Sequence, residues 1–166
     1  SEKQAATDKP QVLETSLPPV AAVQDTVVVP LHNRDNIGIL LDYAEVIADK
    51  REKPLVGFSV VEVPRQLPIH QGLRFTHHRE GLLRAAREEA RDRNIEIETD
   101  LMIAHQASDG ILSGASRYGA DFMVMGWKGY TDTRDRIFGE VADQVIRNSP
   151  CDLAMLKIEN HERPKR

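Results

Sequence analysis

Short β-branched runs alternate with stretches of helical periodicity along this chain, and this alternation narrows the possible folds more than any other feature. Residues 26–31 (TVVVPL) are a continuous apolar run, which is typical of a strand buried on both faces. The predicted strands span residues 26–31, 55–63, 95–105, 121–126 and 152–158. The predicted helices between them span residues 34–50, 76–94, 107–118 and 140–148. This pattern predicts an α/β fold with a doubly wound, five-stranded parallel sheet and helices on both faces.

The order of the predicted strands follows from how apolar each of them is. Residues 95–105 alternate strictly between apolar and acidic side chains at first, which favours a half-exposed strand at one edge of the sheet. The first and fourth predicted strands are apolar and belong in the interior, so the predicted order is 3-2-1-4-5. Ligands of such sheets bind beyond the carboxyl ends of the strands, where the strand order reverses. That switch point lies between the first and fourth predicted strands.

Three glycines mark the connection between the fourth predicted strand and the last predicted helix. Gly126 is followed by two residues, Gly129, nine residues and Gly139, and Glu140 comes directly after the last glycine. Glycine at such positions lets the backbone approach a ligand closely. Backbone N–H groups in such a loop can form a nest for phosphate oxygens, and a helix dipole favours an anion at the helix N-terminus. The sequence therefore predicts an anion-binding loop at the switch point.

The spacing of these glycines resembles the nucleotide signature of the universal stress protein family, which is Gly, two residues, Gly, nine residues, Gly, then Ser or Thr. The strings VVVPL and NSPCDLAML resemble the first strand of that family and the segment that leads into its last strand. The resemblance covers residues 26 to about 158. It implies the fold of the adenine-nucleotide alpha-hydrolase-like group, with adenine and ribose against the first two strands and the triphosphate in the glycine loop.

The resemblance also implies which residues surround the nucleotide. By position they are Pro30, His32, Met125, Gly126, Lys128, Gly129, Gly139, Glu140 and Val141. Lys128, Arg134 and Arg136 either add positive charge to the pocket or are solvated loop cations. The expected ligand is ATP or AMP, with Mg²⁺ as a candidate counter-ion, and an empty pocket is the alternative.

Two positions depart from the family pattern. The first strand of the family usually ends in an aspartate that contacts the nucleotide, and His32 stands there in this chain. The final Ser or Thr of the signature is Glu140. A carboxylate repels a triphosphate and can itself occupy the helix N-terminus, so we interpret Glu140 as a partial substitute for the anion. ATP binding after a rearrangement, a preference for AMP, and an empty site remain alternatives.

A second, narrower resemblance concerns the protein to which this domain is attached. The strings VVEVPRQ (60–66) and MGWKG (125–129) resemble stress-protein domains appended to amino-acid permeases and cation/proton antiporters. On this interpretation residues 1–25 are a flexible linker, residues 26–158 are the domain and residues 159–166 are a flexible tail. The domain is then expected in the cytoplasm, tethered through a transporter to the inner face of the plasma membrane.

Charge and composition exclude several classes of function. A net charge of −4 argues against electrostatic binding to nucleic acid or to an anionic membrane. A single cysteine, Cys151, excludes an internal disulfide and fits a reducing compartment. No apolar run approaches the roughly 20 residues that a membrane-spanning helix needs.

His70, His77 and His78 lack the cysteine or acidic partners of a metal site, so solvated histidines are expected there.

Three functions stay open at this point, and the first is preferred. It is a nucleotide-sensing regulatory domain without robust turnover, and therefore not an enzyme and without catalytic residues. The second is a slow ATPase or nucleotidyl transferase, for which Asp132, Asp135 and Glu140 are the acidic candidates near the γ-phosphate. The third is a ligand-free dimerisation module. A homodimer through residues 152–158 is expected, because this apolar strand lies at the predicted edge and the family commonly pairs there.

Overall fold

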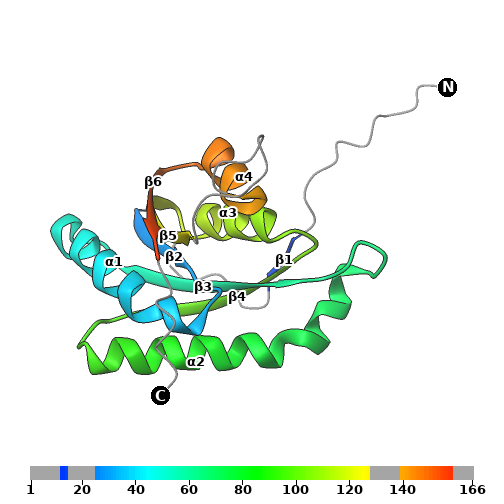
Figure 1. The fold of residues 1–166 in the computed structure, drawn as a ribbon, viewed down its shortest axis with the longest axis horizontal. Coiled ribbons are helices and arrows are strands. Elements are labelled where there is room, and N and C mark those ends of the chain that lie inside the picture. The colour runs from blue at the N-terminus through cyan, green and yellow to red at the C-terminus, as the bar shows by residue number, and fades with distance from the viewer. Residues whose placement is uncertain (1–11, 15–24, 128–138, 159–166) are drawn as a thin grey trace, which may run out of the picture.

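The computed structural model describes residues 12–14, 25–127 and 139–158, and these form a single six-stranded sheet with helices on both faces (Figure 1). The strand order is β1-β4-β3-β2-β5-β6. The strands are β1 (Val12–Glu14), β2 (Thr26–Pro30), β3 (Leu55–Glu62), β4 (Glu98–Ala104), β5 (Ala120–Trp127) and β6 (Asp152–Lys157). Strands β2 to β6 run parallel, and β1 pairs antiparallel with β4.

The helices divide between the two faces of this sheet. They are α1 (Ile37–Arg51), α2 (Thr76–Asp92), α3 (Ala107–Arg117) and α4 (Glu140–Asn148), with the 3-10 helices η1 (Arg34–Asn36) and η2 (Ile69–Phe75) leading into α1 and α2. Helices α1 and α2 cover one face, and α3 and α4 cover the other (Figure 1). Each helix crosses between two parallel strands, which is the arrangement expected of a doubly wound sheet.

The predicted fold class and the predicted order of the five parallel strands are confirmed, since 3-2-1-4-5 corresponds to β4-β3-β2-β5-β6. The sheet nevertheless has six strands rather than five. Residues 12–14, which lie within the segment expected to be a linker, form β1 opposite Met102, Ile103 and Ala104 of β4. Leu13 packs against the core on one face of the sheet and Val12 on the other, so the short strand is held by side chains as well as by the ladder.

Strand β4 therefore differs from the half-exposed edge strand that its alternating sequence predicts. Asp100 is only 4% exposed, although the pattern places it on a polar face. The Tyr118 hydroxyl donates a hydrogen bond to Asp100 Oδ2 at 2.6 Å, and Arg117 Nε lies 3.3 Å from the same oxygen. Helix α3 thus covers this face and ends in two residues that compensate the buried carboxylate, as burial of a charge requires.

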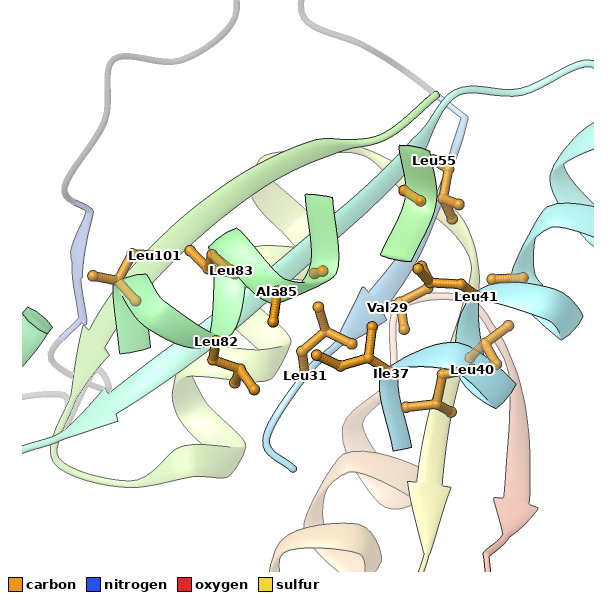
Figure 2. Packing of buried hydrophobic residues seen from close by; sticks show 14 of the residues in the cluster. Val29, Leu31, Ile37, Leu40, Leu41, Leu55, Leu82, Leu83, Ala85 and Leu101 are labelled. Carbon is orange, nitrogen blue, oxygen red and sulfur yellow. The ribbon is translucent and has the colours of Figure 1, made fainter. Parts of the chain in front are cut away.

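The core lies in two layers that meet at β2. Val27 and Val29 face the layer under α1 and α2, and Val28 faces the layer under α3 and α4, so the strand is buried on both faces as predicted. Figure 2 shows Ile37 of α1 and Ala85 of α2 close to Leu31, with Leu83 beside Leu101 of β4, and all of them belong to the same buried cluster. Burying apolar area stabilises the fold by about 25 cal/mol per Å². The carboxyl end of β2 is consequently held firmly from both sides.

Candidate functional site

A cavity of about 390 Å³ opens at the carboxyl ends of β2 and β5, the point where the strand order reverses. This is the position that the sheet topology predicts for a ligand. Its described lining residues are Pro30, Leu31, His32, Asn33, Asn36, Leu40, Phe58, Val60, Glu62, Ala107, Ile111, Met125, Gly126, Trp127, Gly139, Glu140, Val141 and Ala142. Apolar side chains from α1, β3, β5 and α3 form its floor, and polar and charged side chains stand at its rim. A floor and rim of this kind are typical of small-molecule sites.

The end of β2 is fixed by hydrogen bonds to β3. The backbone N–H of Leu31 donates to the Phe58 carbonyl at 2.7 Å, and the Ser59 hydroxyl donates to the Leu31 carbonyl at 2.8 Å. His32 follows with an exposed side chain, and its carbonyl accepts a hydrogen bond from Arg79 at 3.2 Å. Pro30 and His32 are therefore presented to the cavity by a backbone that is well tied down.

The turn after β2 carries two asparagines with different surroundings. Asn33 Oδ1 accepts a hydrogen bond from the Asp35 backbone N–H at 3.0 Å and so caps η1. Asn36 is only 8% exposed, and its Oδ1 is buried without a hydrogen-bond partner among the residues that the structure describes. Both asparagines line the cavity, one at its rim and one deeper inside.

Two of the three predicted glycines, Gly126 and Gly139, lie at the cavity, and they differ in how strongly their surroundings favour glycine. A Cβ at Gly126 would lie 2.9 Å from Ile158 Cδ1, so the end of the Ile158 side chain would have to shift to admit a side chain there. Gly139 has φ 96° and ψ 161°, a backbone conformation that is essentially restricted to glycine. It immediately precedes α4, and its carbonyl accepts the Asp143 N–H at 2.9 Å. The extended turn at Gly139 brings the first residues of α4 to the rim.

The structure brings seven of the nine sequence-predicted residues to this cavity. They are Pro30, His32, Met125, Gly126, Gly139, Glu140 and Val141. Lys128 and Gly129 lie outside the described residues, as do Arg134 and Arg136. The charged groups among the described lining residues are the exposed carboxylates of Glu62 and Glu140, with His32 as the titratable base. This part of the lining alone does not favour a polyanion.

Several lining residues escape sequence reasoning. Phe58 and Val60 face the cavity from β3, Leu40 from α1 and Ile111 from α3, and each has an ordinary core pattern in the sequence. Trp127 is different, because its position between Gly126 and Gly129 already indicates from the sequence that it either covers the pocket or packs on a neighbouring domain, and it lines the cavity. Asn36 stands directly before the apolar stripe of the first predicted helix, where a polar residue is ordinary, so the sequence holds no signal for it.

A shallower cavity of about 430 Å³ lies beside the first and shares His32 with it. His77 and His78 line it from the first turn of α2 rather than from a loop, together with Arg34. Within the described ranges, no three histidine, cysteine, aspartate or glutamate side chains are placed to hold a metal ion. His70, His77 and His78, which were expected to be solvated, are all exposed, and His77 and His78 also line this hollow.

The sequence itself matches a known family over most of its length. Residues 24–157 match the model of the universal stress protein family. This chain belongs to that family.

Solved universal stress proteins share the fold at low sequence identity. One from Archaeoglobus fulgidus is 20% identical, with a TM-score of 0.59 over 81% of this chain and 100% of its own. A universal stress protein in complex with cAMP is 24% identical, with a TM-score of 0.60 over 81% of this chain and 98% of its own. One from Arabidopsis thaliana with AMP bound is 15% identical, with a TM-score of 0.58 over 84% of this chain and 96% of its own.

A relative of another kind is the Na(+)/H(+) antiporter NhaS5 of Synechocystis. It is 26% identical over 145 residues, which cover 87% of this chain and 21% of the antiporter. This universal stress protein domain therefore spans about a fifth of the relative that it matches. None of the described helices is both long enough and apolar enough to cross a membrane.

Proposed function

We propose that this chain is an adenine-nucleotide-binding regulatory domain of the universal stress protein type. The observation that carries the proposal is the cavity at the reversal of strand order, with an apolar floor and with Gly126 and Gly139 at one side. Relatives of the same fold that are known with cAMP, dAMP or AMP support an adenine nucleotide as the ligand. The base enters the apolar part of the cavity, and the ribose lies at the rim near His32.

The phosphates, on this proposal, extend toward the glycines and the beginning of α4. Gly126, Gly139 and Val141 flank that path, and Lys128 and Gly129 are proposed to complete it. Glu140 stands at the first turn of α4, where a helix favours negative charge. A carboxylate there competes with a long phosphate chain, so AMP is the preferred ligand and ATP, with or without Mg²⁺, binds more weakly.

The regulated partner is proposed to be a membrane transporter. The similarity to about a fifth of a Na(+)/H(+) antiporter supports this attachment. In such a parent the domain lies in the cytoplasm, at the inner face of the membrane, and reports nucleotide occupancy to the transport domain. Nucleic acid is not a proposed partner, because the chain carries a net charge of −4.

The decisive experiment is to denature the purified protein and to identify any released nucleotide by mass spectrometry, followed by calorimetric titration of AMP, ADP, ATP and GMP. We expect an adenine nucleotide to be released or to bind, with AMP tighter than ATP. If no purine nucleotide binds, the proposed function is wrong, and the alternative of a ligand-free dimerisation module is favoured. A turnover assay with excess ATP is expected to show no multiple turnover, and sustained hydrolysis would identify a slow ATPase or a nucleotidyl transferase instead.

A further inference from the structure

We propose that the second cavity, the shallow hollow of about 430 Å³ that shares His32 with the first, binds a phosphate-type oxyanion more tightly as the pH falls. The ligand is a free inorganic anion or the phosphate group of a small ester. The proposal goes beyond nucleotide binding, because it concerns a second site that the glycine signature does not include. It does not require that a nucleotide occupies the first cavity.

The first observation is that the described lining of the second cavity carries basic side chains and no carboxylate. His32 and Arg34 come from the segment between β2 and α1, and His77 and His78 come from the first turn of α2. Two elements that are distant in sequence therefore contribute groups of the same chemical kind to one hollow. Guanidinium and imidazolium groups are the usual partners of phosphate and sulfate oxygens in proteins.

The second observation is that hydrogen bonds hold the two sides of this cavity together. Arg79 Nη1 donates to the His32 carbonyl at 3.2 Å, which joins α2 to the end of β2. Asn33 also lines the cavity, and its Oδ1 accepts the Asp35 backbone N–H at 3.0 Å. This cap engages the oxygen of Asn33, so its amide nitrogen, a donor, is the more available group for a ligand. The lining thus offers donors on a fixed frame.

The third observation is that the three histidines of the lining are exposed and can change their charge. An ordinary imidazole becomes positively charged as the pH falls through about 6.5, and both of its nitrogens then donate hydrogen bonds. Arg34 and Arg79 keep their charge throughout this range. Asp35 and Glu80 are the neighbouring acids along the chain, and both are exposed and absent from the described lining. A falling pH therefore adds positive charge to the cavity, and an anion gains affinity.

The pH dependence is assigned mainly to His77 and His78. His32 also lines the first cavity, where the described carboxylates are those of Glu62 and Glu140. These carboxylates attract the charged form of His32 whether or not an anion occupies the second cavity. His77 and His78 line the second cavity alone, so their charge is the one that a bound anion affects most directly.

The test uses sulfate as the probe, because its charge does not change between about pH 6 and about pH 8 and any pH dependence then belongs to the protein. The ring signals of the histidines are followed by NMR on the whole chain, with sulfate replacing chloride at constant ionic strength. We expect the signals of His77 and His78 to shift and saturate. The affinity should be roughly two- to thirtyfold higher at about pH 6, as two exposed charge pairs allow. His70, exposed outside the cavity, is the internal reference.

Variants assign the effect to the cavity. The double variant His77→Gln/His78→Gln keeps polar side chains that cannot become charged. It should weaken sulfate binding at about pH 6 by roughly two- to thirtyfold and should remove most of the pH dependence. Arg34→Gln should weaken binding by roughly 1.5- to fivefold at both pH values. His70→Gln is the matched control, because it makes the same substitution on an exposed histidine outside the lining, and it should bind sulfate as the wild type does.

Two results would overturn the proposal directly. One is an equal shift of all histidine signals, including those of His70, which would be a general salt effect. The other is an unchanged pH dependence in the double variant. A comparison of inorganic phosphate with glycerol 3-phosphate distinguishes the two sources of the anion, since tighter binding of the ester assigns a small phosphate ester and equal binding assigns the inorganic ion.

A sulfate titration in the presence of AMP separates this proposal from the proposed function. We expect sulfate to bind while AMP is bound. If AMP displaces sulfate, the anion occupies the nucleotide site, and a separate site is wrong. If AMP does not bind at all, the proposed function fails, and the sulfate titrations of the wild type and the variants still decide whether the second cavity binds an oxyanion.

Discussion

Glu140 is the residue at which this chain departs most informatively from the glycine signature. It is exposed at the first turn of α4 and lines the cavity. We predict that Glu140→Ser raises the affinity for ATP by roughly two- to thirtyfold, because it removes a negative charge worth about 0.3–2 kcal/mol at a helix N-terminus. AMP should gain less, since its single phosphate need not reach the helix. Calorimetric titration of both nucleotides at one salt concentration measures the change.

Asp143 supplies the matched control for that prediction. It lies in the same first turn of α4 but is absent from the described lining of the cavity. Asp143→Ser removes the same charge from the same helix end and should leave the preference between ATP and AMP almost unchanged. An equal shift in both variants would mean that the overall charge of the helix end matters, and that Glu140 has no special position.

Tyr118 gives a prediction about the dependence of stability on pH. Burial, together with the hydrogen bond to Asp100, raises the pKa of Tyr118 from 10.0 to about 12. A raised pKa means that the folded state favours the neutral hydroxyl, so its contribution is complete below about pH 10 and is lost as the pH rises toward 12. Tyr118→Phe should cost about 1–3 kcal/mol of unfolding free energy at pH 7. Urea titrations should show this difference shrinking between about pH 10 and 12, and a constant difference would argue against the assignment.

At the level of single residues, the sequence predicted the site where backbone geometry dictates the residue type. Gly139 has a backbone conformation that favours glycine strongly, and this requirement leaves a visible spacing in the sequence. Asn36 and Phe58 could not be found in the same way. They reach the cavity from η1 and β3 because of how those elements pack, and packing partners distant in sequence leave no local pattern.

Among the elements, α4 depends most on a single backbone position. Gly139 precedes it with φ 96° and ψ 161°. We predict that Gly139→Ala lowers the unfolding free energy by about 1–3 kcal/mol, the usual cost of holding another residue in such a conformation. Urea unfolding measures the loss, and the binding of AMP should weaken with it because the beginning of α4 moves.

Gly81 is the control for this substitution. It lies inside α2, has no positive φ, and a Cβ there would have no atom within 4 Å. Gly81→Ala should therefore stabilise the protein by up to about 1 kcal/mol through helix propensity alone. If both alanine variants were stabilised, the backbone at residue 139 would not need a glycine.

The helices and strands show where the spacing of apolar residues in the sequence predicts secondary structure correctly. Helices and parallel strands were predicted close to their observed bounds, because the helices repeat their apolar spacing over several turns and the strands are short apolar runs between them. Strand β4 misled the prediction, since its alternation suggested a polar face at Asp100. The side chains that compensate this carboxylate, Tyr118 and Arg117, come from the end of α3, and only the packed structure brings them together.

For the whole molecule, β6 is the strand through which two chains are proposed to pair. Ile158 N–H donates to the Trp127 carbonyl, so alternate residues of β6 direct their backbone groups to β5 and the N–H of Met155 faces outward. We predict that Met155→Pro shifts a dimer toward monomers, because proline removes that outward donor. Light scattering at micromolar protein measures the shift, with Met155→Leu as the control that keeps the N–H. A wild type that is monomeric under these conditions would contradict the proposed interface.

The architecture as a whole was predictable apart from its first strand. The order of the parallel strands follows from which runs are apolar throughout, and it was confirmed. Strand β1 has three residues in a polar segment that contains proline, which is too short for any period to show. Its existence depends on the open side of β4, and that side is visible only once the sheet is assembled.

Strand β1 also sets a limit on how many chains can join. A sheet with two open sides can add partners at both, and repeated addition produces a ribbon without a fixed length. Here one side ends in a three-residue strand, which offers few groups to a further chain. The proposed pairing through β6 about a two-fold axis would use the other side. On that proposal the sheet sets an upper limit of two copies for assembly through its edges.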